Sequence, residues 1–172
     1  MDKNDALDVR QGDHRKIPFD TDFFDFAFMT DVIHHVPDLL SMFSELRRVI
    51  KSDGRLCVVT ESHEQIEGRF YNCYFPSLAA NEKSRYPDIS NIVETAERVG
   101  FVVNETEILF PSSYAVIDKN FVKNVEEKNY SMFRLLDKKE FIKGLQKVKN
   151  DLGRAFERNN SGETLIWLKN NG

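Results

Sequence analysis

The feature that most limits the fold of this sequence is a run of an apolar, an amphipathic and a second apolar segment within residues 24–61. Phe24–Thr30 (FDFAFMT) is apolar on both faces apart from Asp25, which predicts a central strand covered by helices on both sides. Arg55–Glu61 (RLCVVTE) predicts a second buried strand. Two buried strands joined by a helix predict a right-handed βαβ unit with parallel strands, and therefore an α/β fold.

The segment between the two strands has the pattern of a helix with one apolar face. The apolar stripe comprises Leu39, Met42, Phe43, Leu46, Val49 and Ile50. Asp38 suits the first turn, where the helix dipole favours an anion, and Arg47, Arg48 and Lys51 suit the last turns. Gly54 follows the predicted end of the helix.

Further elements follow from the same patterns. We expect a short strand at Ala6–Gln11, a helix at Asn91–Val99 ending at Gly100, a strand at Phe101–Phe110, a long helix from Asp137 to Phe156, and a final strand at Glu163–Lys169. The second half of Phe101–Phe110 alternates polar and apolar residues, which indicates a position near a sheet edge. Asp137-x-x-Glu140 resembles a capping box.

Two aromatic-containing segments, 62–88 and 111–136, break the regular pattern. The first follows the carboxyl end of a predicted strand, so its aromatic residues Phe70, Tyr71, Tyr74 and Phe75 are candidates for a lid that excludes water from a substrate. Tyr71 and Tyr74 are the expected substrate contacts. Simple coverage of the sheet by these side chains is an equally good interpretation. Residues 111–136 are expected to form a second wall.

Composition narrows the functional classes. With 172 residues, 41% apolar and 30% charged, the chain is expected to form one globular domain over 1–172. A net charge of −4 argues against general nucleic-acid binding. No apolar run is long enough for a membrane span, and Met1–Asp5 lacks the character of a secretory signal, so we expect a cytoplasmic protein that binds neither nucleic acid nor membrane. Cys57 and Cys73 are expected to be unpaired.

A series of short motifs then occurs in a fixed order over about 50 residues. They are Gly12-Asp13, Ile17-Pro18-Phe19, Phe24-Asp25, His34-His35-Val36, Glu45 to Lys51, and Asp53-Gly54-Arg55-Leu56. In this order and spacing they resemble the middle of a class I S-adenosylmethionine-dependent methyltransferase, of the methyltransferase type 11 kind. The resemblance implies a partial Rossmann-like, doubly wound sheet that is mostly parallel with an antiparallel edge strand.

One departure from the family is clear. None of the eight glycines is spaced as the G-x-G of the family's first loop. The resemblance begins at the family's third strand, so the chain looks like the C-terminal two-thirds of such an enzyme, strands 3 to 7 of the order 3-2-1-4-5-7-6.

The resemblance also implies a site for S-adenosylmethionine. Asp13 would accept a hydrogen bond from the adenine amino group, with Gly12 and the backbone of His14 beside the ring. The alternative for Asp13 is a turn-forming residue after Gly12. The backbone of Thr30 and Asp31 would face the methionine moiety.

The two neighbouring histidines have separate expected roles. His34 would contact the cofactor, and His35 is the candidate base towards the acceptor. A structural role, in which one histidine caps a helix or packs beneath the loop, remains open. A metal site is not expected, because the histidines and cysteines lack metal-ligand spacing.

The functional prediction is methyl transfer from S-adenosylmethionine to a small-molecule acceptor. A non-catalytic assembly subunit built on the same fold is the alternative, and a different Rossmann-like nucleotide enzyme is a weaker one, because the glycine loop is absent. Without the family's first two strands, Phe24–Thr30 would present an open apolar edge. We therefore expect a homodimer formed across that strand edge, unless the first strand moves in to cover it.

Overall fold

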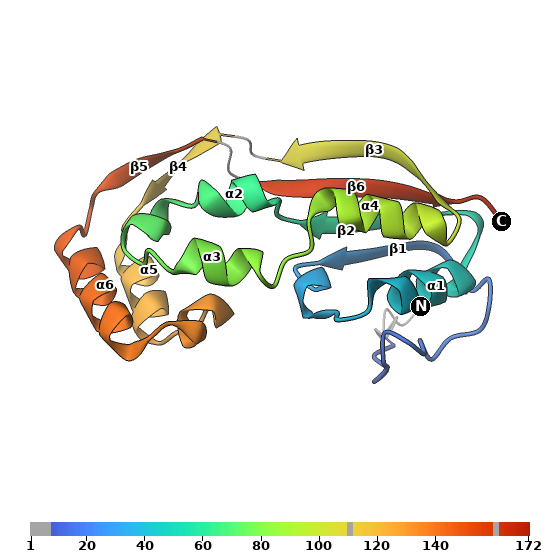
Figure 1. Cartoon of the computed structure of the whole chain (residues 1–172), viewed down its shortest axis with the longest axis horizontal. Coiled ribbons are helices and arrows are strands. Elements are labelled where there is room, and N and C mark those ends of the chain that lie inside the picture. The colour runs from blue at the N-terminus through green and yellow to red at the C-terminus, as the bar shows by residue number, and fades with distance from the viewer. Residues whose placement is uncertain (1–7, 110–111, 160–161) are drawn as a thin grey trace, which may run out of the picture.

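A four-stranded sheet forms the centre of the computed structural model, which describes residues 8–109, 112–159 and 162–172 (Figure 1). The strands lie in the order β1-β2-β6-β3. Their bounds are β1 Phe24–Thr30, β2 Ile50–Thr60, β6 Glu163–Asn170 and β3 Phe101–Leu109. This order matches the 4-5-7-6 part of the order expected from the family.

Strand directions confirm the predicted fold class. β1 and β2 pair in parallel, with Ala27 opposite Leu56. β6 runs antiparallel to both of its neighbours, β2 and β3. β1, β2 and β3 therefore point the same way, and the edge strand β3 pairs antiparallel with β6. The βαβ unit predicted from residues 24–61 is the βαβ unit of the structure.

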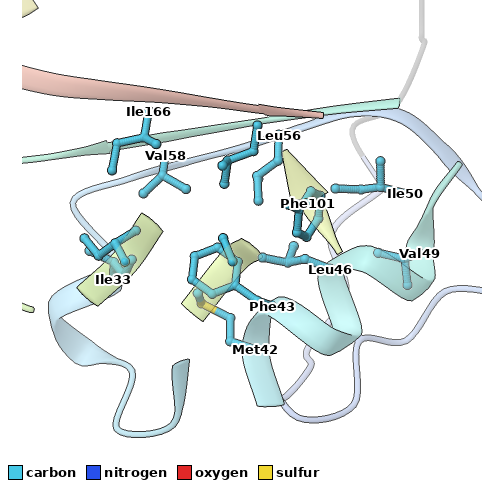
Figure 2. Packing of buried hydrophobic residues seen from close by; sticks show 13 residues of the cluster. Ile33, Met42, Phe43, Leu46, Val49, Ile50, Leu56, Val58, Phe101 and Ile166 are labelled. Carbon is cyan, nitrogen blue, oxygen red and sulfur yellow. The ribbon is translucent and has the colours of Figure 1, made fainter. Parts of the chain in front are cut away.

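Helices α1 (Leu39–Val49) and α4 (Ile89–Arg98) pack on one face of this sheet. The cluster between them joins apolar residues of both helices and all four strands, and Figure 2 shows its centre around Phe43. Phe43 is fully buried and packs edge-to-face on Phe101, with ring centroids 6.3 Å apart. The apolar stripe predicted from the sequence is the face of α1 that packs on the sheet. Ile50, which was assigned to this stripe, belongs to β2.

On β1, β2 and β6, the apolar residues of the opposite face of the sheet, here called the outer face, are Phe26, Phe28, Cys57, Val59, Leu165 and Trp167. In the described part of the chain, none of these side chains belongs to a hydrophobic cluster. Phe28 is 70% exposed and Phe26 is 47% exposed. The prediction that helices cover β1 on both sides is therefore wrong. A sequence that is apolar on both faces shows that a strand avoids water, but not that a helix of the same chain covers it.

A second hydrophobic cluster lies beyond the carboxyl ends of β1 and β2 (Figure 1). It is built from helices α3 (Leu78–Lys83), α5 (Lys119–Glu126) and α6 (Lys138–Asn150), the 3-10 turns η2 (Phe70–Cys73) and η3 (Ser131–Leu135), and the two-stranded antiparallel sheet of β4 (Ser112–Val116) and β5 (Ala155–Asn159). Helix α2 (His63–Glu67) and the turn η1 (Ile33–His35) connect this part to the sheet. Segments 62–88 and 111–136 thus surround a core of their own and do not cover the sheet.

Two predicted elements differ from the structure. Residues 8–11 of the expected strand Ala6–Gln11 form no strand, and Val9 is 79% exposed, while Ala6 and Leu7 lie outside the described residues. The long helix from Asp137 ends at Asn150, and Phe156 belongs to β5. Gly153, with a φ of 89°, provides the turn between them.

Side-chain caps fix the helix starts. Asp38 accepts a hydrogen bond from the Ser41 backbone N–H at 3.0 Å. Asp137 caps α6 in the same way, but Glu140 does not complete the predicted box. Its carboxylate instead accepts hydrogen bonds from the backbone N–H and the hydroxyl of Ser77. Glu140 therefore joins α6 to α3.

The basic end of α1 holds the segment before β1. Arg48 donates hydrogen bonds to the carbonyl oxygens of Ile17 and Phe19 at 3.0 and 2.9 Å, and Glu45 accepts one from the Ile17 N–H at 2.9 Å. Glu45 and Arg48 also pair with each other at 2.8 Å. The pair therefore anchors the Ile17-Pro18-Phe19 motif.

Gly144 provides a stability test of the second cluster. A Cβ atom at Gly144 would lie 2.2 Å from the buried Phe75 ring and 2.7 Å from the Tyr74 carbonyl oxygen. Alanine favours a helix over glycine by about 1 kcal/mol, but overpacking costs about 1–3 kcal/mol. We expect Gly144→Ala to lower the free energy of unfolding by about 1–2 kcal/mol in urea denaturation. Lys143→Ala, at the exposed neighbouring position, should stay within about 0.5 kcal/mol of the parent. An equally stable Gly144→Ala protein would mean that Phe75 can move aside.

Both cysteines are unpaired, Cys57 buried in the sheet and Cys73 exposed. Within the described residues, every helix is too short or too polar to cross a membrane.

Candidate functional site

A cavity of about 580 Å³ lies at the carboxyl ends of β1 and β2, between the sheet and the second cluster. This is the edge at which open α/β sheets bind ligands. Its wall is formed by the ends of β1 and β2, by η1 and by residues of the two possible lid segments, 62–88 and 111–136. The lining residues include Asp31, His34, His35, Glu61, Arg69, Tyr71, Glu82, Tyr86 and Tyr130. The volume suits a small organic molecule.

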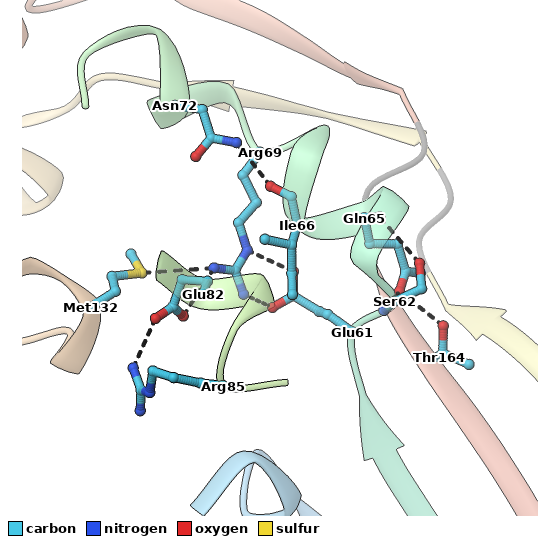
Figure 3. Close-up of polar contacts among 10 residues, drawn as sticks. All are labelled: Glu61, Ser62, Gln65, Ile66, Arg69, Asn72, Glu82, Arg85, Met132 and Thr164. Atoms are coloured by element: carbon cyan, nitrogen blue, oxygen red, sulfur yellow. Dashed lines mark hydrogen bonds and ion pairs between the residues drawn. The ribbon is translucent and has the colours of Figure 1, made fainter. Parts of the chain in front are cut away.

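Arg69 is the central polar residue of the wall (Figure 3). Its guanidinium donates two hydrogen bonds to the Glu61 carboxylate, the one from Nε being 3.0 Å long. A third donor group of Arg69 lies 3.3 Å from Glu82, which also accepts a hydrogen bond from Arg85 at 2.8 Å. Arg69 and Glu82 are almost completely buried. The network therefore ties the end of β2 to α3 and fixes one wall of the cavity.

The two histidines predicted for the site lie together on η1. Their ring centroids are 4.1 Å apart, and the His34 ring stacks on Tyr86 at 4.3 Å. His34 Nδ1 is buried and has no hydrogen-bond partner. Burial lowers the pKa of His34 to about 4, and the positive charges of His35, Arg85 and Arg69 act in the same direction. His34 is therefore neutral at neutral pH, and its stacking agrees with the structural role left open above.

This environment makes stability depend on pH. The unfolded chain binds a proton at His34 below a pH of about 6.5, but the folded chain does so only near 4. We expect the free energy of unfolding to fall as the pH is lowered through this interval. Urea denaturation at several pH values should show a steeper loss for the parent protein than for His34→Gln. Identical pH profiles of the two proteins would contradict this prediction.

Asp31 directly follows β1 and has an unusual backbone conformation. Its φ is 53°, in the left-handed region that aspartate tolerates better than most residues. Among the described residues, no basic group pairs with its carboxylate. Burial, followed by the negative charge of Glu61, raises the pKa of Asp31. Strained backbone and an unpaired carboxylate beside a cavity are typical of a binding site.

The structure places Gly12, Asp13 and His14 apart from this cavity wall, beside the N-terminal end of α1. Both Asp13 carboxylate oxygens accept hydrogen bonds from Arg15, at 2.9 and 2.8 Å, and the Asp13 carbonyl oxygen accepts one from the Lys16 N–H. This is the geometry of a turn-forming residue, the alternative stated for Asp13. Gly12 packs closely on Pro18, since a Cβ there would lie 2.7 Å from the proline ring.

Of the other predicted site residues, some line the cavity and some do not. Asp31, His34, His35 and Tyr71 line the cavity. Tyr74 does not, because its hydroxyl lies 2.6 Å from an Asp151 carboxylate oxygen within the second cluster. Thr30 is exposed at the end of β1.

Three charged residues of the wall were not predicted: Glu61, Arg69 and Glu82. Glu61 could have been found from its position, because it directly follows a buried strand and open α/β sheets bind ligands at the carboxyl ends of their strands. Arg69 and Glu82 lie in a segment without periodicity, and only the tertiary structure brings them together. No group of three or more His, Cys, Asp or Glu side chains in the described ranges is arranged to hold a metal ion.

Residues 1–58 match a family model described as a methyltransferase domain. The chain is 32% identical over 69 residues to demethylmenaquinone methyltransferase from Bacillus subtilis. That match covers 40% of this chain and 29% of the relative, so the chain spans less than a third of that enzyme's length.

Solved structures share the fold over nearly the whole chain. One is a protein from Anabaena variabilis described as a candidate methyltransferase of an antibiotic biosynthesis pathway, with a TM-score of 0.71 and 18% identity. The superposition covers 92% of this chain and 71% of that chain. Geranyl diphosphate C-methyltransferase from Streptomyces coelicolor, solved with S-adenosylhomocysteine, gives a TM-score of 0.51 and 16% identity over 93% of this chain and 52% of that chain.

Proposed function

We propose that this chain belongs to the class I S-adenosylmethionine-dependent methyltransferase family, which the match of residues 1–58 and the fold support, and that it transfers a methyl group to a small-molecule acceptor. The observation that carries the proposal is the cavity of about 580 Å³ at the carboxyl ends of β1 and β2. The acceptor would occupy this cavity, between the end of the sheet and the lid segments.

The residues around the cavity fit a cofactor with a positively charged sulfur. Asp31 carries an unpaired carboxylate, and His34 is neutral, so neither repels a sulfonium. When bound, S-adenosylmethionine supplies a methyl group that is already activated for displacement. The backbone of Thr30 and Asp31 and the ring of His34 would hold its methionine part.

For the adenine we propose Gly12, Asp13 and the backbone of His14. Asp13 would have to exchange its hydrogen bonds with Arg15 for one with the adenine amino group. Because Arg15 is largely exposed, with 64% of its side chain accessible, this exchange costs little.

The protein's own contribution is orientation and the exclusion of water. Tyr71 and the Arg69 network form one wall of the cavity, and His35 lies within it as the proposed base towards the acceptor. Methyl transfer needs mainly a nucleophile held close to the methyl carbon, so a compact catalytic triad is not required.

Calorimetric titration of the chain with S-adenosylhomocysteine tests the proposal. We expect saturable binding of one molecule per chain, and about tenfold weaker binding to Asp13→Ala after loss of a charge-assisted hydrogen bond. Asp25→Ala, an exposed aspartate at the start of β1, is the matched control and should bind like the parent. Absence of binding to the parent protein would exclude the enzymatic function.

One feature favours a second candidate, an assembly subunit that forms a homodimer. Within the described residues, β1 is the last strand on its side of the sheet, and the exposed rings of Phe26 and Phe28 lie on this strand. A second copy pairing along β1 would hydrogen-bond the free edge and place its own side chains beside both rings. We expect a dimer in sedimentation analysis that Phe28→Glu converts to a monomer, while Leu152→Glu, at an exposed apolar residue of the other part, has no effect. A monodisperse parent monomer would exclude the dimer. The cytoplasmic location stays a prediction.

A further inference from the structure

We infer that the cavity takes an organic amine in its ammonium form, held beside the Asp31 carboxylate and among aromatic rings. The inference deepens the proposed function, on which it rests, by assigning a chemical class to the acceptor. It depends on three features of the cavity wall: its charged side chains, the hydrogen bonds that Arg69 already makes, and its aromatic ring faces.

The charged residues of the wall are predominantly acidic. Asp31, Glu61 and Glu82 are carboxylates, and Arg69 is the basic residue among the lining residues that the structure describes. Arg85, behind the wall, neutralises part of Glu82 at 2.8 Å. The carboxylate that remains without an ion pair is Asp31. A cation bound there meets a free negative charge without displacing an existing partner.

Arg69 is not available for an anionic ligand. Its donors are directed at Glu61, Glu82 and the Met132 sulfur, and 7% of its side chain is accessible. To bind a phosphate or carboxylate, Arg69 would have to leave the partly buried Glu61 unpaired and leave the buried Glu82 with Arg85 alone, which is strongly unfavourable. The one strong anion-binding group of the described wall is therefore already in use.

The remaining wall is aromatic. It contains Phe70, Tyr71, Tyr86, Phe121 and Tyr130. The faces of Tyr71 and Tyr86 already stabilise a cation, since the Arg69 guanidinium carbon lies 5.8 and 5.7 Å from their ring centroids. Aromatic faces beside a carboxylate attract an ammonium group through the ring quadrupole and give an apolar substituent a surface to pack on.

Neighbouring acids support the same conclusion. Burial raises the pKa of Glu163, and the charges of Asp31 and Glu61 contribute. Asp31 itself is held above its usual pKa by burial and then by Glu61, with Arg69 acting in the opposite direction. A bound cation would relieve this repulsion. Transfer of the ammonium proton to His35, the proposed base, would then leave the nitrogen lone pair free, as a nucleophilic amine requires.

Calorimetric titration of the intact chain at neutral pH with three probes of similar shape tests the inference. The probes are phenethylamine, the neutral phenethyl alcohol and the anionic phenylpropanoate. We expect phenethylamine to bind at least tenfold more tightly than either of the others. Asp31→Asn should remove this preference by weakening amine binding about tenfold, without changing alcohol binding. Asp25→Asn, an exposed aspartate at the other end of β1, should retain it.

The outcomes separate this inference from the proposed function. Equal binding of the alcohol or the anion, no detectable amine binding, or an unchanged preference in Asp31→Asn would each overturn the amine assignment. Binding of S-adenosylhomocysteine, measured separately, tests the enzyme itself. Amine selectivity without cofactor binding would leave the cation site in place and overturn the methyltransferase proposal. Cofactor binding without amine selectivity would support the methyltransferase proposal and overturn the amine assignment.

Discussion

Replacing Arg69 with methionine should lower the free energy of unfolding by about 3–5 kcal/mol, because the change leaves the partly buried Glu61 without an ion-pair partner and the buried Glu82 with Arg85 alone. Glu82 is 3% exposed, and the Glu61 side chain is 17% exposed. Methionine has a similar length and is apolar, so the loss is electrostatic and not a loss of volume. Urea denaturation of both proteins measures the difference.

Two comparisons keep this prediction specific. Lys51→Met removes an exposed ion pair, with Asp25 at 2.9 Å, and should cost less than about 1 kcal/mol. Adding Glu61→Gln and Glu82→Gln to Arg69→Met should recover much of the lost stability, because the buried charges are then gone. If the combined variant is no more stable than Arg69→Met alone, the cost has another origin than unpaired charge.

Phe43→Ala should cost about 3–5 kcal/mol, since it opens a cavity under a fully buried ring between α1 and the sheet. The matched control is Phe28→Ala, on the outer face of the same sheet, where 70% of the side chain is exposed. That variant should change the free energy of unfolding by less than about 1 kcal/mol. Comparable losses in the two variants would show that the outer face is covered in solution.

These two positions also show how far the sequence could predict the structure. Phe43 was identified from the spacing of apolar residues in one helix, since periodicity reports which face of an element avoids water. β1, α1 and the final strand followed in the same way. Arg69 could not be found, because its partners are 8 and 13 residues away in a segment without regular period. Its role arises only from tertiary packing.

Other differences have equally local causes. The apolar pattern of Phe24–Thr30 is the same whether or not a helix covers its second face, so the exposure of Phe28 could not be predicted. The helix expected from Asp137 to Phe156 ends before Gly153, which forms the turn to β5. For the candidate site, the sequence placed Asp31, His34, His35 and Tyr71 at one cavity, whereas Tyr74 was assigned by its neighbourhood in the chain and packs elsewhere.

The position of β6 bears on how the molecule is assembled. β6 lies between β2 and β3 although it follows both in the chain. Leu56 of β2 pairs with Leu168 of β6, which is 112 positions later in the sequence. During synthesis, β2 and β3 therefore leave the ribosome without the strand that joins them. The hydrogen-bond ladders on both sides of β6 can close only after residues 163–170 have been made. Until then, α1 and α4 have no continuous sheet to pack on, and the nascent protein depends on a late, long-range pairing step.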